Sequence, residues 1–208
     1  MSRILVINPN SNEAVTEGLR QALAVFARPR SPEIFCETLA EGPFGIETQE
    51  HVEAVAMPLR RRIEAAEADA FVIACYSDPG LHVCREGTAK PVFGIAECGV
   101  LTALARGDRF GVIAIKSRSI PRHIRYLRQM GLMERLAGER ALEMSVAESA
   151  SGEGTLARMI EKGRELRDLD GAGVVVMGCA GMARHRAPLE RALGVPVHDA
   201  DASVHALY

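Results

Sequence analysis

Short apolar segments alternate with longer amphipathic segments along almost the whole chain, and this alternation restricts the possible folds more than any other feature. The apolar runs, rich in Val and Ile, predict strands at residues 3–7, 33–39, 70–74, 91–95, 110–115, 141–145, 173–178 and 195–198. Helical periodicity lies between them, near residues 12–27, 51–67, 79–88, 120–130, 155–168 and 182–193. Strands that alternate with helices in this way are typical of parallel sheets covered on both faces. We therefore expect an α/β fold with a binding site at the carboxyl ends of its strands.

The second half of the sequence repeats the pattern of the first. Residues 70–95 contain a strand, Cys75, a glycine turn, a helix and a proline, and residues 174–199 contain the same order around Cys179. The step from cysteine to proline is 16 residues in the first copy and 17 in the second. Any parallel α/β protein repeats weakly at this length, but the matched cysteines favour two equivalent lobes.

The repeat predicts two lobes related by a pseudo-twofold axis, each with a four-stranded parallel sheet flanked by helices. Residues 1–98 together with about 199–208 would form the N-terminal α/β lobe, and residues 99–198 would form the C-terminal α/β lobe. The helices after residues 97 and 200 would each cross to the other lobe. We expect the active site in the cleft between the lobes.

The composition excludes several classes of partner. With 48% hydrophobic and 25% charged residues the chain is typical of a soluble globular protein. A formal net charge of −2 without a basic stripe argues against nucleic acid. No apolar run approaches the ~20 residues that a membrane helix needs, and the apolar segment near the N-terminus is too short for a signal peptide. We therefore expect a cytoplasmic protein with no membrane partner.

The cysteine and histidine spacings argue against metal and cofactor sites. Five cysteines without a CxxC pair fit a reducing compartment better than a disulfide framework or a zinc site. The six histidines lack ligand spacing, and no GxGxxG or P-loop pattern occurs. We expect no metal and no cofactor. Cys36, Cys84 and Cys98 fall in predicted strands or helices and are expected to pack in the core.

Cys75 and Cys179 each follow a buried strand and precede a glycine-containing turn and a helix. A thiol at a helix N-terminus has a lowered pKa and can act as a base or a nucleophile. The alternative is that each is a buried core cysteine, the usual position of a free cysteine. If the lobes place the two thiols across one cleft, one thiol can remove a proton from a carbon and the other can return a proton to the opposite face.

The loop after the first strand is rich in amides and hydroxyls. Asn8, Asn10 and Ser11 can bond a planar ligand that carries amide or carboxylate groups. Ser11 or Asn12 would also cap the next helix, with backbone amides of the loop directed at the cleft. The alternative is that the whole loop serves capping and turn formation.

Two further loops flank the predicted cleft. After Cys75, Tyr76 and Ser77 are expected at the site, and Ser77 or Asp78 fits the N-cap of the following helix. The pseudo-symmetric partner of the Asn-rich loop offers hydroxyls and two cations through Lys116, Ser117, Arg118 and Ser119. The alternative is that these cations are surface residues without a role.

The loop around Cys179 is built from small residues. Gly178, Ala180 and Gly181 let a ligand approach the backbone, and successive backbone N–H groups there can bind an anion. This Gly-Cys-Ala-Gly run after a buried strand is the most specific local signal in the chain.

Taken in order along the chain, these segments resemble the aspartate/glutamate/hydantoin racemase superfamily, and within it the hydantoin and allantoin racemase branch. The matching segments are 4–11, 45–47, 73–75, 78–81, 94–97 and 178–182. The resemblance implies two Rossmann-like lobes, homo-oligomers, a cofactor-free mechanism and Cys75 and Cys179 as an acid/base pair. It also adds Ile46 to the predicted substrate-binding residues.

The resemblance implies racemisation or epimerisation at a carbon next to a carbonyl. One thiolate would remove the proton, the other thiol would donate to the opposite face, and amides of loops 8–11 and 179–181 would stabilise the enolate. Relatives that decarboxylate arylmalonates keep only the second cysteine, so the presence of both favours a racemase. Tyr76-Ser77 and residues 115–118 depart from the hydantoin racemase pattern in loops that select the substrate. The substrate is therefore left open among hydantoin-like, allantoin-like and amino-acid-derived compounds.

Three alternatives remain on the sequence alone. The chain could be an arylmalonate-type decarboxylase or a maleate-type cis–trans isomerase of the same superfamily, in which Cys179 protonates or adds to an unsaturated diacid. It could also be a two-lobed small-molecule binding protein with both cysteines merely packed.

Overall fold

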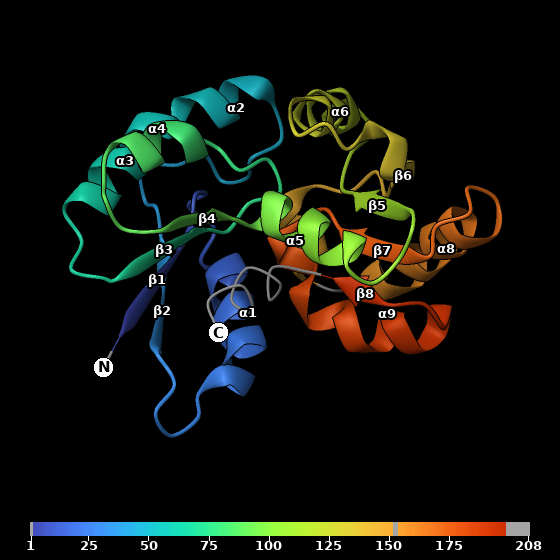
Figure 1. The fold of residues 1–208 in the computed structure, drawn as a ribbon, viewed down its shortest axis with the longest axis horizontal. Coiled ribbons are helices and arrows are strands. Elements are labelled where there is room, and N and C mark those ends of the chain that lie inside the picture. Colours follow the sequence, from blue (N-terminus) through green and yellow to red (C-terminus); the bar gives the residue numbers. More distant parts are fainter. Residues whose placement is uncertain (1, 152–153, 199–208) are drawn as a thin grey trace.

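The computed structural model describes residues 2–151 and 154–198, which form two four-stranded parallel sheets side by side (Figure 1). The first sheet contains β1 (Arg3–Asn8), β2 (Glu33–Thr38), β3 (Ala70–Ile73) and β4 (Val92–Gly94) in the order β2-β1-β3-β4. The second contains β5 (Phe110–Ala114), β6 (Leu136–Ala141), β7 (Val174–Met177) and β8 (Val197–His198) in the order β6-β5-β7-β8. The predicted α/β fold with two four-stranded parallel sheets is confirmed.

Helices cover the sheets on both faces, as continuously apolar strands require. In the first half they are α1 (Glu13–Leu23), α2 (Gln49–Ala54), α3 (Ala56–Glu64), α4 (Leu81–Glu86) and α5 (Ile95–Leu104). In the second half they are α6 (Ile120–Gln129), α7 (Val146–Ser151), α8 (Thr155–Asp168) and α9 (Arg186–Leu193). Short 3-10 turns precede or follow them at η1 (Ala24–Phe26), η2 (Ser117–Ser119), η3 (Met133–Arg135) and η4 (Ala180–His185).

The core has three parts, and one of them joins the lobes. Helices α2, α3 and α4 bury their apolar sides against one face of the first sheet, and α5 and α6 do the same on the second sheet. The third cluster places Val15, Leu19 and Leu23 of α1 between strands β1 and β3 and the residues of β7, α8, η4 and α9. Because α1 packs against η4 and α7 as well as β2, it holds the carboxyl ends of the two sheets together.

Helix α5 leaves β4 and packs against β5, β7 and β8 of the second sheet. The division of the chain into lobes at residue 98 stays a prediction, and the predicted return of residues 199–208 to the first lobe lies outside the described residues. No helix among the described residues is long and apolar enough to cross a membrane. The five cysteines, all of them in the described part, form no disulfide, and Cys84 and Cys98 are buried.

The prediction of a strand at 141–145 is wrong. The strand is β6, five residues earlier, and it is an edge strand whose residues are all half-buried. Leu142 and Met144 continue to donate backbone hydrogen bonds to β5 and the residue after it, but Glu143 between them adopts a φ of +54°, which ends regular pairing. Leu142 and Met144 are buried, so their apolar character reflects the core rather than a strand.

Candidate active site

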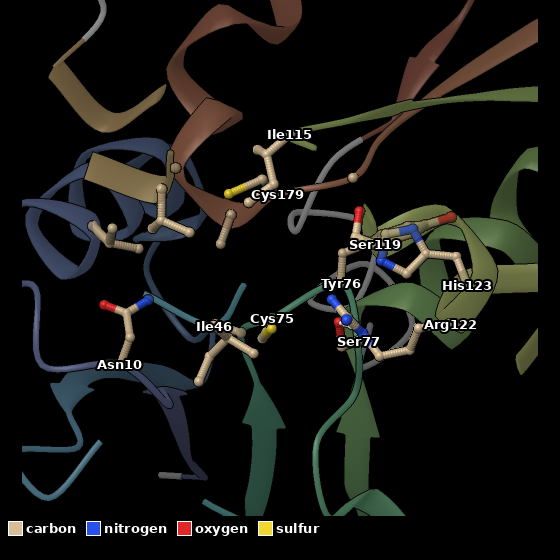
Figure 2. Close-up of a pocket in the computed structure, with 16 residues that line it drawn as sticks. Asn10, Ile46, Cys75, Tyr76, Ser77, Ile115, Ser119, Arg122, His123 and Cys179 are labelled. Atoms are coloured by element: carbon tan, nitrogen blue, oxygen red, sulfur yellow. Dashed lines mark hydrogen bonds between the residues drawn. The ribbon is translucent and has the colours of Figure 1, made fainter. Parts of the chain in front are cut away.

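The loops that follow β3 and β7 meet in one pocket between the two sheets (Figure 2). This is the carboxyl end of both sheets, where parallel α/β folds bind ligands. The pocket is lined by Asn10, Val15, Ile46, Ala74, Cys75, Tyr76, Ser77, Ile115, Ser119, Arg122, His123, Val146, Gly178, Cys179, Ala180 and Gly181. The pocket therefore brings together Cys75 and Cys179, which lie 104 positions apart in the sequence.

Cys75 is half-buried, and its sulfur accepts a hydrogen bond from the backbone N–H of Ser77. Burial raises the pKa of the Cys75 thiol to about 12, against the lowering influence of that N–H and of the nearby Arg122 guanidinium. The predicted lowering by a helix N-terminus is wrong, because the next helix begins only at Leu81, behind a left-handed Gly80. Removal of water from the sulfur is therefore the dominant effect on this thiol.

Cys179 follows β7 and begins the 3-10 turn η4. Burial raises the pKa of its thiol, and the backbone N–H of Gly181 bonded to the sulfur opposes that shift. The Ser149 hydroxyl lies 3.8 Å from the sulfur. The preceding Gly178 is required because a Cβ there would lie 2.7 Å from the carbonyl oxygen of Ile113 in β5. The close approach of the two strands thus fixes where Cys179 leaves the sheet.

The Asn-rich loop is held by its own side chains. Asn8 is fully buried and outside the pocket, and its amide donates to Asn10 Oδ1 and Thr16 Oγ1. Asn12 caps α1 by accepting from the backbone N–H of Ala14, as predicted for Ser11 or Asn12. The backbone N–H groups of Asn10, Ser11 and Asn12 all have partners within the protein.

The backbone amides of this loop are therefore not available to stabilise an enolate, and the predicted role of loop 8–11 can fall only to its side-chain amides. The loop instead presents the side chain of Asn10 to the pocket (Figure 2). Asn10 Oδ1 accepts from both Asn8 and the Asn12 backbone, which leaves the Asn10 Nδ2 as the donor available to a ligand. Ser11 does not line the pocket.

Asp78 caps a different helix from the one predicted. Its carboxylate accepts from the backbone N–H groups of Ala96 at 2.9 Å and Glu97 at 2.8 Å in the first turn of α5, and from the Tyr126 hydroxyl at 3.1 Å. The helix that follows Asp78 in the sequence has no side-chain cap. Gly94 is required at this point, since a Cβ would lie 2.2 to 2.5 Å from the Asp78 carboxyl atoms. Asp78 thus fixes the loop after Cys75 against α5 and α6.

We expect Asp78→Ala to lower the free energy of unfolding by about 2–3 kcal/mol, because it leaves two buried N–H groups of α5 without an acceptor. Urea denaturation at about pH 8 measures this with the carboxyl ionised, since burial raises its pKa to about 7. Asp78→Asn keeps one acceptor and should lose roughly half as much. A loss below about 0.5 kcal/mol in the alanine variant would contradict the capping role.

Lys116, Ser117 and Arg118 of the predicted cationic loop do not line the pocket. Glu47, on the opposite lobe, accepts Lys116 Nζ at 2.8 Å and Arg118 at 2.9 Å, and its other oxygen accepts the backbone N–H of Val146. Burial tends to raise the pKa of the Glu47 carboxyl, but these donors outweigh burial, and the net result is a pKa below its usual range. Ser117 also stays outside, with its backbone N–H bonded to Glu143. The loop therefore joins the lobes beside the pocket.

Helix α6 and the turn before it supply Ser119, which belongs to the predicted loop, and two pocket residues that the sequence pattern did not predict. Ser119, Arg122 and His123 line the pocket from this segment. His123 Nδ1 lies 2.5 Å from Glu139 of β6, and its ring meets the Tyr76 ring edge-on at 5.0 Å. The signal that could have revealed Arg122 and His123 is their position, since they are polar residues at the start of a helix that begins just after a strand end. They lie only about one turn beyond the predicted cationic loop.

A model of the Asp/Glu/hydantoin racemase family matches residues 4–207. The chain belongs to the Asp/Glu/hydantoin racemase family. A hydantoin racemase of Pseudomonas sp. (strain NS671) is 36% identical over 202 residues, which are 95% of this chain and 80% of that protein. The hydantoin racemase of Paenarthrobacter aurescens is 35% identical over 203 residues, with 95% and 85% coverage.

Solved structures agree with this family membership. An allantoin racemase from Klebsiella pneumoniae has a TM-score of 0.93 and 33% identity, with 100% of this chain and 86% of that chain covered. An arylmalonate decarboxylase with the Gly74Cys substitution has a TM-score of 0.70 at 18% identity, with 99% and 91% coverage, and shares the fold alone. This member of the Asp/Glu/hydantoin racemase family is thus an isomerase of the racemase type, in the hydantoin and allantoin branch. The alternative of a binding protein without activity is not supported.

The pocket of this racemase is narrow. Its free volume is about 20 Å³, which is room for about one water molecule, whereas pockets that hold a small ligand measure roughly 300–1,000 Å³. A substrate therefore requires movement of the lobes or of the side chains between them. Within the described residues, no group of three or more His, Cys, Asp or Glu side chains is arranged to hold a metal ion.

Proposed function

We propose that this protein is a cofactor-independent racemase or epimerase in which Cys75 and Cys179 form the acid/base pair. The supporting observation is that both thiols line one pocket from the equivalent strand ends of the two sheets. In Figure 2 the two sulfur atoms lie on different walls of that pocket, Cys75 on the first-sheet side and Cys179 on the second-sheet side. A carbon held between them would have one thiol on each face.

The reaction is a balanced exchange of protons. One sulfur, as thiolate, takes the proton from the carbon next to the carbonyl, and the electron pair of the C–H bond moves into the carbonyl to give an enolate. The other sulfur, as thiol, then gives its proton to the opposite face of that carbon, and the carbonyl is restored. The enzyme ends with the thiol and thiolate exchanged, ready for the opposite enantiomer. Since the two thiols supply both proton transfers, no further acid or base is needed.

The enolate oxygen needs hydrogen-bond donors that are already in position. Asn10 Nδ2 fits this role, because its own Oδ1 is fixed by two hydrogen bonds. The backbone N–H of Ala180 is the second group we assign to it, since the neighbouring N–H of Gly181 is bonded to Cys179. Positioned proton transfer contributes about 10²–10⁴-fold to such reactions, and a donor to the oxyanion contributes about 10²–10³-fold.

For the substrate we propose a compound of the hydantoin or allantoin kind, or an amino-acid derivative related to them. The relatives named hydantoin racemase and allantoin racemase support this choice. In a hydantoin ring the reacting carbon lies between a ring carbonyl and a ring nitrogen, and the ring is flat. The apolar side chains of Ile46, Tyr76 and Ala180 line the pocket and suit the faces of such a ring.

The remaining parts of the proposal concern the cell and the assembly. The absence of disulfides among the five cysteines fits the predicted cytoplasmic compartment. We also retain the prediction of a homo-oligomer, which size-exclusion chromatography with light scattering tests directly.

A substrate screen tests the proposed function. Single enantiomers of 5-substituted hydantoins, allantoin and acidic amino acids are incubated with the protein in ²H₂O, and optical rotation and deuterium content are followed. We expect loss of rotation with uptake of one deuterium for at least one hydantoin or allantoin. Release of CO₂ from an arylmalonate, or loss of maleate absorbance, without racemisation of any compound would contradict the proposal.

A further inference from the structure

Arg122 is an unusual residue for this pocket. Among the described residues that line it, Arg122 is the one Lys or Arg, and none is Asp or Glu. Its Nε donates to the neutral Ser77 hydroxyl at 3.1 Å, and no carboxylate lies within 4 Å of its guanidinium in the described structure. A guanidinium stays charged and presents a fork of donors that matches a carboxylate. The half-buried guanidinium can therefore bind an anion without first breaking an ion pair.

The other cations near Arg122 have partners of their own. Lys116 and Arg118 share Glu47, and Arg125 donates to Gln49 at 2.8 Å. One oxygen of the Glu139 carboxylate contacts His123, and the other is buried without a hydrogen-bond partner among the described residues. Burial lowers the pKa of Arg122, as expected of a charge that has lost water without gaining an anion. An anionic ligand in the pocket would therefore meet Arg122 without competing with an internal ion pair.

A surface groove meets the pocket at Arg122. The groove measures about 490 Å³ and lies between α2, α3, α4 and α6. Two residues, Ser77 and Arg122, line both this groove and the pocket, and they are hydrogen-bonded to each other. Figure 2 shows the Arg122 guanidinium beside Ser77, on the same side of the pocket as Cys75. The two side chains therefore lie between the narrow pocket and the groove.

The acidic residues of the groove do not pair with Arg122. Glu53 accepts the Gln49 amide at 2.6 Å. Asp78 is turned toward the backbone N–H groups of α5. The groove also contains Arg125, so the positive side of the opening lies on α6.

We propose that Arg122 selects substrates whose side group is negatively charged, and that this group points from the reacting carbon toward the groove. The chemical class is a 5-substituted hydantoin, or its allantoin-like counterpart, with a carboxylate on the side arm. The proposal rests on the proposed racemase function and narrows its substrate. The ring stays between the thiols while the carboxylate replaces Ser77 as the partner of Arg122 and forms a bidentate pair with it.

The first test compares two substrates that differ in charge alone. For wild type, kcat/KM is measured with 5-(2-carboxyethyl)hydantoin and with its amide, 5-(2-carbamoylethyl)hydantoin. We expect wild type to prefer the carboxylate and Arg122→Gln to lose that preference by about 10- to 100-fold, mainly through KM. Arg122→Lys keeps the charge but lacks the forked set of donors, so its preference for the carboxylate should be several-fold lower than that of wild type. Arg128→Gln, an exposed change of equal charge on the same helix, should leave the preference unchanged.

The second test needs no turnover. Alkylation of Cys75 by anionic iodoacetate and by neutral iodoacetamide is followed by peptide mass spectrometry. Relative to wild type, we expect Arg122→Gln to shift the rate ratio toward iodoacetamide by about tenfold, and Arg128→Gln not to shift it. If no hydantoin is racemised but the ratio shifts, the proposed function fails and the anion selection by Arg122 stands.

Unchanged ratios in both tests overturn the proposal for Arg122, even if racemisation is observed. If Arg122→Gln does not fold, Arg122→Lys replaces it in both tests, and an unchanged substrate preference in that variant overturns the proposal as well. A wild-type enzyme that prefers the amide substrate to the carboxylate would also overturn the proposal.

Discussion

We expect Cys75→Ser and Cys179→Ser each to abolish racemisation, with kcat reduced by about 10²–10⁴-fold or more. The serine hydroxyl has nearly the size of the thiol but is a far weaker acid. It therefore does not ionise to give the anion that removes the proton. Loss of either partner stops inversion, because a proton must leave from one face and arrive at the other. Polarimetry at saturating concentrations of each enantiomer measures the effect.

The matched control for these variants is Cys36→Ser. Cys36 is half-buried on the edge strand β2 and does not line the pocket, so its replacement should leave kcat within about twofold. Each single-thiol variant should still exchange the reacting proton of one enantiomer with solvent deuterium. Racemisation at the wild-type rate in either pocket variant would contradict the assigned acid/base pair.

The second large effect is a steep rise of activity with pH. Burial raises the pKa of both pocket thiols, to about 12 for Cys75. A raised thiol pKa means that little thiolate is present at neutral pH and that more forms as the pH increases. We therefore expect kcat/KM to rise about tenfold per pH unit between about pH 6 and pH 8, and to fall only where the second thiol also loses its proton.

The alkylation of Cys75 by iodoacetamide reports the same ionisation without substrate, and its rate should rise over the same range. If the pH profiles of kcat/KM and of alkylation agree, the pH dependence of kcat/KM comes from the thiol and not from ionisation of the substrate. A rate constant for alkylation that is level from about pH 6 to pH 8 would show a low thiol pKa and contradict the raised pKa of Cys75.

The fold was largely predictable because its strands are buried on both faces. Segments such as Val174–Met177 are continuously apolar, and such runs stand out in the sequence. The edge strand β6 was not predictable for the opposite reason. Glu139 contacts His123 and Arg140 forms an ion pair with Asp170, so no apolar run marks the strand. The apolar residues just after it belong to the core.

The pocket was predictable where a residue lies at a strand end, as for Cys75, Tyr76 and Cys179, because topology alone brings such positions together. It was not predictable where the outcome depends on a contact between lobes. Glu47 removes Lys116 and Arg118 from the pocket through ion pairs across the cleft. Asp78 caps α5 rather than the helix that follows it. Neither partner can be identified from sequence distance.

Deuterium partition in the wild-type enzyme is the most direct test of two thiols that act from opposite sides of one carbon. A single enantiomer of an active substrate is converted in ²H₂O, and both enantiomers are separated and analysed by mass spectrometry during the first few per cent of reaction. We predict that the product enantiomer carries deuterium from the outset while the remaining starting enantiomer stays unlabelled. Equal early labelling of both enantiomers would indicate one base serving both faces and would contradict the two-thiol mechanism.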